Sequence, residues 1–320
     1  MSRIFFILLL VVVLLLLNKF YIDNIIENVY SRVNPSIRIA SNLKGDRIER
    51  IIFKSIPRKY TFSQKRLSKN AFILIHGYNT FPRSMEKLMI GLKEFRYDIY
   101  CPLMKYHGYG IKGSKNLNNS EVSERLLEDI EYVCSLGYEK IFCVGYSYSG
   151  LQLVSLSSKD LLKKNIYMIL INPAIKLRND SYAFMVLLVI SMLYSSYIFK
   201  NYSLFSTYRI GMRNNDNYKT TLYEHCEYIY VKMVAIRIIT FSKGIVKEMK
   251  KFSDFIRNKF TVIFSVDDRL LSCKESKELF TAQKRFKAFF EVNGGHSIPF
   301  DDNHTGNLVS KIKSSMAIFE

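Results

Sequence analysis

The segment that most constrains the fold of this 320-residue chain covers residues 141–151 and reads IFCVGYSYSGL. An apolar, β-prone stretch stops at Gly145, and a helix-compatible stretch begins at Leu151. Ser147 lies in the middle of the short turn between them. A strand that turns sharply into a helix around a central serine presents the serine hydroxyl where it can act as a nucleophile. Ser147 is therefore the first candidate catalytic residue.

The residues around Ser147 depart slightly from the usual pattern Gly-x-Ser-x-Gly. Gly145 holds the first small position, but Ser149 stands at the second, and Gly150 follows one place later. Small residues are needed there because the strand and helix backbones approach closely. Ser149 adds one Cβ and one hydroxyl. Taken alone, the segment also fits a serine-rich loop after a buried strand, so other segments must support the interpretation.

Candidate partners for Ser147 follow two later strand-like segments. Asp267 and Asp268 come one residue after the apolar run at 260–265, and His296 follows two glycines after the next run. A carboxylate at a strand end can orient an imidazole, and the glycines let the chain turn so that the imidazole reaches back over the sheet edge. Each residue also has a structural interpretation, Asp268 as a helix N-cap and His296 as a surface turn residue. The order Ser, Asp, His in strand contexts favours a catalytic triad.

A loop upstream carries a further signature. The strand-like run AFILI at 71–75 is followed by HGY at 76–78. With this loop and the order Ser, Asp, His, the chain resembles the α/β-hydrolases of the carboxylesterase and monoacylglycerol-lipase branch. The G-H-G turn of that branch keeps only its last two residues here, at 107–108. We expect His76 and His107 to support the loop without chemical roles of their own.

The resemblance implies a doubly wound, mostly parallel sheet and assigns roles to individual residues. Ser147 would be the nucleophile, His296 the base and Asp268 the acid, with the aspartate before Asp268 as the fallback. The backbone N–H groups of Tyr78 and Tyr148 would form the oxyanion hole. Such a site needs no cofactor and no metal.

Hydrophobic patterning agrees with this fold class. Strand-like runs, including IYMILIN at 166–172, alternate with amphipathic stretches at 81–95, 120–135 and 151–162 that predict helices. Strands that alternate with helices are typical of a parallel sheet covered on both faces. We assign the α/β-hydrolase core to residues 45–175 and 256–320.

The N-terminus predicts a membrane anchor over residues 1–22. An unbroken apolar run at 4–17 follows Arg3, and Asn18 and Lys19 come next. A span of about 20 residues becomes possible when the following aromatic residues are included. A cleaved signal peptide is the alternative, although no A-x-A-like cleavage site follows. Residues 23–44 would form a stalk, and we expect a bacterial inner membrane, with the facing side left open.

An insertion separates the two parts of the core. It covers residues 176–255, which is too long for an ordinary connection, so we expect a helical cap or lid. Its stretch YAFMVLLVISMLYSSYIF at 182–199 contains no charge. A lid helix over an acyl pocket, a helix at the bilayer interface and a second span are the three interpretations.

Charge and cysteine content set weaker bounds. The net charge is +19, from 47 Lys and Arg against 28 Asp and Glu. This charge fits attraction to an anionic membrane surface, or the codon usage of an AT-rich genome. Basic residues are spread along the chain without a nucleic-acid motif, so no nucleic-acid partner is expected. The five cysteines show no disulfide framework.

The function expected from these features is a serine hydrolase that cleaves carboxylic esters through an acyl-enzyme. The predicted anchor, the apolar insertion and the family resemblance favour a lipid-like ester such as a monoacylglycerol or a lysophospholipid. A peptidase or thioesterase would use the same triad. A catalytically retired, membrane-anchored binding protein is the alternative outside the enzymes.

Overall fold

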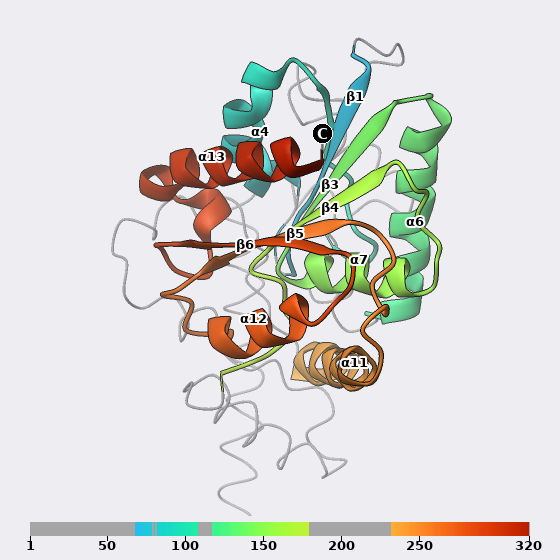
Figure 1. The fold of residues 1–320 in the computed structure, drawn as a ribbon, viewed down its shortest axis with the longest axis vertical. Helices are drawn as coiled ribbons and strands as arrows, with labels where there is room; N and C mark the ends of the chain where they lie inside the picture. Colours follow the sequence, from blue (N-terminus) through green and yellow to red (C-terminus); the bar gives the residue numbers. More distant parts are fainter. Residues whose placement is uncertain (1–67, 79, 81, 108–116, 179–231, 320) are drawn as a thin grey trace, which may run out of the picture.

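Parallel strands form the centre of the protein (Figure 1). The computed structural model describes residues 68–78, 80, 82–107, 117–178 and 232–319. Within them lies a six-stranded sheet in the order β2-β1-β3-β4-β5-β6, and every strand pair is parallel. The strands are β1 (Asn70–Ile75), β2 (Asp98–Tyr100), β3 (Lys140–Tyr146), β4 (Ile166–Ile171), β5 (Phe260–Ser265) and β6 (Phe286–Val292). The parallel part of the fold prediction is confirmed.

The strand order reverses between β1 and β3, which are neighbours in the sheet. In an open α/β sheet, ligands bind in the crevice at the carboxyl ends of the strands where the order reverses. The residues that follow β1 and β3 therefore border the expected binding crevice. These are the loop that begins at His76 and the turn that contains Ser147.

Helices cover both faces of the sheet. One face carries α4 (Glu86–Leu92), α13 (Asp302–Phe319) and the short 3-10 helices η2 (Pro82–Met85), η3 (Lys93–Phe95) and η6 (Ile298–Phe300). The other carries α6 (Asn119–Ser135), α7 (Tyr148–Ser158), α11 (Lys232–Lys251) and α12 (Cys273–Thr281). Because neither face meets water, the central strands are apolar along their whole length.

The alternation of side chains along β1 divides the core into two layers. Phe72 and Leu74 pack with α4 and α13, whereas Ala71, Ile73 and Ile75 pack with the helices of the other face. All five side chains are buried. This double burial holds the strand ends in fixed positions.

The observed helices match the expected ones closely, with different ends. The stretch predicted at 81–95 is η2, α4 and η3 in succession, and the one at 120–135 is α6. The helix expected at 151–162 is α7, which begins three residues earlier and ends at Ser158. It ends there because Asp160 adopts a left-handed φ of 59° and a Schellman pair of bonds closes the last turn.

Two predicted membrane segments lie outside the described residues. These are the anchor at 1–22, with its stalk at 23–44, and the apolar stretch at 182–199. Among the helices that the structure does describe, none has the length and apolar character that a membrane crossing requires. Of the range assigned to the insertion, α11 is described, and its Ile245 and Met249 are buried against the sheet layer.

Candidate active site

Ser147 occupies a strained turn between β3 and α7. No residue separates it from either element, and its φ of 56° is unusual for a residue other than glycine. A Cβ added to Gly145 would lie 3.0 Å from the Cα of Gly150, and one added to Gly150 would lie 3.0 Å from the Cβ of Pro173. The tight turn therefore favours glycine at both positions, and it holds Ser147 at the carboxyl edge of the sheet.

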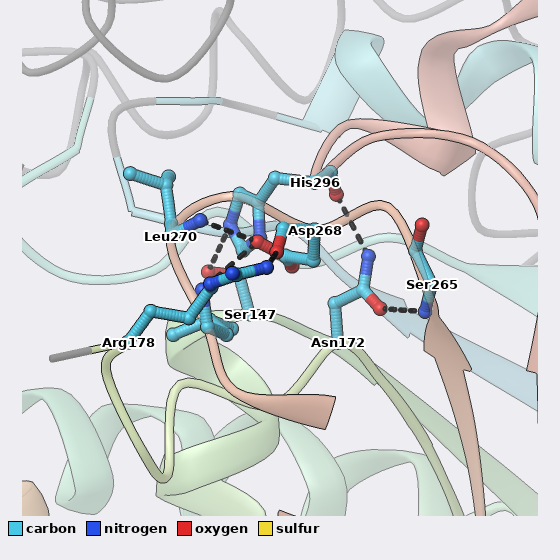
Figure 2. Close-up of polar contacts among 8 residues, drawn as sticks. Ser147, Asn172, Arg178, Ser265, Asp268, Leu270 and His296 are labelled. Carbon is cyan, nitrogen blue, oxygen red and sulfur yellow. Dashed lines mark hydrogen bonds and ion pairs between the residues drawn. The ribbon is translucent and has the colours of Figure 1, made fainter. Parts of the chain in front are cut away.

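The three residues predicted as a triad are joined in series by hydrogen bonds (Figure 2). The Oγ of Ser147 lies 2.9 Å from the Nε2 of His296, and the Nδ1 of His296 lies 2.7 Å from the Oδ2 of Asp268. These residues come from three separate parts of the chain. Ser147 is 9% exposed, so little of the residue meets solvent. A nucleophile, a base and an orienting acid within bonding distance form the arrangement used for acyl transfer.

Asp268 is held firmly as the partner of His296. Its side chain is fully buried, and its second oxygen, Oδ1, accepts from the backbone N–H groups of Leu270 at 2.8 Å and Leu271 at 2.9 Å. The Nη1 of Arg178 lies 3.4 Å from the Asp268 carbonyl oxygen. Charge-assisted bonds from two N–H groups stabilise the carboxylate in one orientation, so Asp268 can fix the ring of His296.

Asp267, the fallback acid, takes a different position. It is exposed, and its Oδ2 accepts a 3.1 Å bond from the backbone N–H of Gly294. Gly294 is in the loop that leads to His296 and has a left-handed φ of 117°. Asp267 therefore supports the histidine loop, whereas Asp268 meets the imidazole itself.

His76 supports the loop after β1, as expected. Its side chain is fully buried, and Nε2 accepts from the backbone N–H of Met104 at 3.2 Å. Nδ1 must then carry the proton, which it donates to the carbonyl oxygen of Gly77 at 2.9 Å. Burial and the neighbouring His107 hold the pKa of His76 well below its ordinary value. A neutral imidazole thus fixes the backbone just before Tyr78.

His107 is the second support of this loop. It is buried, its Nδ1 lies 3.0 Å from the carbonyl oxygen of Lys105, and its ring meets those of His76 and Tyr78 edge to face at 5.0 and 5.7 Å. Burial lowers the pKa of His107 to about 4. The expectation that His107 has a structural role agrees with this packing.

The two residues predicted to form the oxyanion hole are neighbours. The rings of Tyr78 and Tyr148 meet edge to face with centroids 6.2 Å apart. Tyr148 is the first residue of α7, where a backbone N–H has no acceptor within the helix. Its hydroxyl donates to the side-chain oxygen of Asn119 at 2.6 Å, which fixes the ring. The role of the two N–H groups in catalysis stays a prediction.

Two of the described cysteines, Cys101 and Cys143, belong to the apolar core. Cys101 and Cys143 are buried beside or within the sheet, and burial raises the pKa of both thiols. They act as small apolar side chains, as expected. Within the part of the chain that the structure describes, no three His, Cys, Asp or Glu side chains gather as metal ligands would.

Two polar residues, Ser149 and Asn172, make backbone contacts at the site that the sequence did not predict. The hydroxyl of Ser149 lies 2.7 Å from the carbonyl oxygen of Ile75, at the end of β1. Asn172 is fully buried and bonds to the backbone of both Ser265 and His296. An Asn-Pro pair after a buried strand is a turn signal that could have drawn attention to Asn172.

A parallel sheet covered on both faces, with a serine turn after β3 and a histidine loop after β6, is the arrangement of the α/β-hydrolase fold.

No family model and no curated protein sequence matches the chain. Solved structures do match it. A metagenome-derived lipolytic enzyme is 13% identical, with 78% of this chain and 94% of that chain covered and a TM-score of 0.61. The monoacylglycerol lipase of Paleococcus ferrophilus is 18% identical (76% and 92% covered, TM-score 0.59).

A soluble variant of the monoglyceride lipase of Saccharomyces cerevisiae is a further neighbour. It is 15% identical, with 77% of this chain and 85% of that chain covered and a TM-score of 0.56. At such low identities the likeness establishes the fold. The predicted resemblance to the esterase and monoacylglycerol-lipase fold is thereby confirmed.

Proposed function

We propose that this protein is a serine hydrolase that cleaves carboxylic esters. The observation that carries the proposal is the bonded series from Ser147 through His296 to Asp268, at 2.9 and 2.7 Å, with the serine on a strained strand-to-helix turn. A serine with φ of 56° is in a strained conformation of the kind that is found most often at active sites.

The proposed mechanism follows from these contacts. His296 takes the proton of Ser147 through Nε2 as the Oγ attacks the ester carbonyl carbon. Asp268 keeps the Nδ1 of His296 protonated and stabilises the imidazolium that forms. The alcohol leaves with the proton from His296, and an acyl-enzyme remains. Water, activated by the same imidazole, then hydrolyses the acyl-enzyme and restores Ser147.

The negative charge that develops on the carbonyl oxygen needs two N–H donors. The proposed donors are the backbone amides of Tyr78 and Tyr148. The buried His76 fixes the chain before the first donor, and the start of α7 provides the second with the favourable end of a helix dipole. Loss of one such donor typically costs about 10²–10³ in kcat.

The proposed substrate class is a lipid-like ester, such as a monoacylglycerol or a lysophospholipid. Support comes from the uncharged stretch at 182–199 and from the apolar run at 4–17, which lies within the membrane anchor proposed for residues 1–22. Two of the neighbours in fold are described as monoacylglycerol and monoglyceride lipases. A thioesterase, a peptidase and a retired, membrane-anchored binding protein are the alternatives that the substrate test must separate.

The proposal is tested by kinetics on the full chain in detergent. Ser147→Ala and His296→Ala should each lower the hydrolysis of p-nitrophenyl esters and of monoacylglycerol by roughly 10³-fold or more, with the fold retained. Ser158→Ala, at the far end of the same helix, is the matched control and should keep wild-type activity. Most of the activity remaining in either triad variant would overturn the assignment. A wild-type chain that cleaves thioesters or peptides but no esters would move it to another reaction.

A further inference from the structure

Asn172 connects the carboxyl ends of two strands to the histidine loop (Figure 2). It follows β4 directly, and its side-chain oxygen accepts from the backbone N–H of Ser265, the last residue of β5, at 2.7 Å. Its side-chain nitrogen donates to the backbone carbonyl oxygen of His296 at 3.0 Å. Each functional atom of this amide therefore has one backbone partner.

Asn172 makes these bonds from an unusual backbone conformation. The residue is fully buried and has a left-handed φ of 40°, which few residues other than glycine adopt. Asparagine tolerates that region and brings a donor and an acceptor with it. An apolar residue here would leave the N–H of Ser265 and the carbonyl of His296 without this partner.

Asn172 also lies beside the backbone that holds the nucleophile. The N–H of Ser147 donates to the carbonyl oxygen of Ile171 at 2.9 Å, one residue before Asn172. The N–H of Asn172 donates to the carbonyl oxygen of Ile263 at 2.9 Å. Asn172 is thus bonded to β5 and to the backbone of His296, and its neighbour Ile171 is bonded to the backbone of Ser147.

We propose that Asn172 is a positioning residue that sets the distance between His296 and Ser147. The inference rests on the proposed hydrolase function. By holding the main chain of His296 to the ends of β4 and β5, Asn172 fixes where Nε2 meets the serine hydroxyl. A shift of about 1 Å between reacting groups can cost about 10²-fold in rate.

Two variants of Asn172 test the contribution of its side-chain donor and acceptor. Asn172→Asp keeps an acceptor for Ser265 and replaces the donor to His296, whereas Asn172→Gly removes both contacts and accepts the left-handed φ without strain. Both should lower kcat on p-nitrophenyl butyrate by about 10- to 100-fold and leave KM within about twofold. Rates are expressed per site titrated with a fluorophosphonate, so that partial unfolding lowers the titre and not kcat.

Asn258→Asp is the matched control. Asn258 is also buried and also donates to backbone carbonyls, those of Lys163 and Ile166 at 3.0 and 3.3 Å, but it precedes β5 at the opposite edge of the sheet. The same change of amide to carboxylate there should lower stability and leave kcat per titrated site unchanged.

A double-mutant cycle with His296→Ala decides whether Asn172 acts through the histidine. Triad variants retain residual turnover that can be measured. In the His296→Ala background the probe labels Ser147 too slowly to count sites, so rates there are expressed per folded protein measured by circular dichroism. Asn172→Gly should reduce this residual rate by less than about twofold. An equal loss in both backgrounds, or wild-type kcat in Asn172→Gly, overturns the inference. Absence of turnover and of labelling in the wild-type chain would instead contradict the proposed function.

Discussion

Ser149 shows how a single residue lets this chain depart from the usual small-residue pattern. Its side chain is fully buried in the first turn of α7, and its hydroxyl lies within bonding distance of the carbonyl oxygens of Ile75 and Tyr146, at 2.7 and 3.0 Å. The added hydroxyl is satisfied, and it ties the serine turn to the end of β1. The departure therefore fits an intact turn and gives no sign of a retired site.

The two adjacent aspartates should differ sharply in their effect on activity. Asp268→Asn should lower kcat on the order of 10⁴-fold, because loss of the carboxylate favours the wrong tautomer of His296. Asp267→Asn should cost less than about tenfold, because its amide oxygen can still accept from Gly294. Steady-state kinetics on both purified variants make the comparison. A severe loss confined to Asp267→Asn would contradict the account.

Sequence reasoning named the three side chains that the structure brings together, but not the contacts around them. Ser147, Asp268 and His296 are recognisable because each follows a strand-like run, and strand ends meet at one edge of a parallel sheet. The choice between Asp267 and Asp268 depends on a single turn, in which the N–H of Asp268 lies 3.3 Å from the carbonyl oxygen of Ser265. The bonds of Asn172 depend on chain segments that are far apart in sequence, so no local pattern predicts them.

At the scale of elements, the loop after β1 depends on a pair of buried histidines. His76 and His107 pack edge to face at 5.0 Å, and both have a pKa below the ordinary value because of burial. Both are therefore neutral near pH 7. Protonation of either would place a charge in a dry site beside the predicted oxyanion hole.

This pair makes the stability of the fold dependent on pH. The pKa of His107 is about 4 in the folded protein and near 6.5 when exposed, so below pH 6.5 the unfolded chain binds a proton that the native chain does not. The stabilisation is present above pH 6.5 and is lost as the pH falls toward 4, by roughly 3 kcal/mol from His107.

Urea unfolding of wild type and His107→Gln between pH 7.5 and pH 4.5 measures this effect. The free energy of unfolding of the variant should fall less steeply with acidification than that of wild type. His304→Gln replaces a partly exposed histidine and should keep the wild-type slope. The same slope in wild type and His107→Gln would show that His107 is not buried and neutral.

Hydrophobic periodicity located the helices well, but their ends less well. Hydrophobic periodicity shows which face of a helix is buried, but it does not show at which residue the helix begins or ends. The start of α7 at Tyr148 depends on the left-handed Ser147, and its end depends on the left-handed Asp160. Both are conformations that residue type alone does not predict.

At the scale of the whole molecule, the sequence places a strongly basic chain behind an apolar N-terminal run. The fold class follows from strands that alternate with helices, and the order of the strands places the serine turn beside the loop after β1.

The proposed anchor, with residues 4–22 as its apolar part, and the net charge of +19 are two different ways to bind a membrane. They respond differently to salt, because apolar burial is insensitive to ionic strength and charge attraction is screened within about 8 Å.

The full chain should therefore stay in the membrane fraction through a high-salt wash. A chain beginning at Arg32 should lose this integral anchoring and stay soluble even at low salt. Salt release of the shortened chain would assign its binding to surface charge, and release only by detergent would assign it to the stretch at 182–199. Fractionation followed by immunoblotting reports each outcome. Release of the full chain by salt alone would contradict the anchor.

The most direct test of the central claim is covalent labelling by a fluorophosphonate probe, with the modified residue mapped by mass spectrometry. The hydrogen bond from Ser147 to His296 predicts one adduct on Ser147, at a rate that falls sharply in His296→Ala. Ser147→Ala should not label at all. Labelling at another serine, or none in a folded wild-type chain that also fails to turn over esters, would contradict the account.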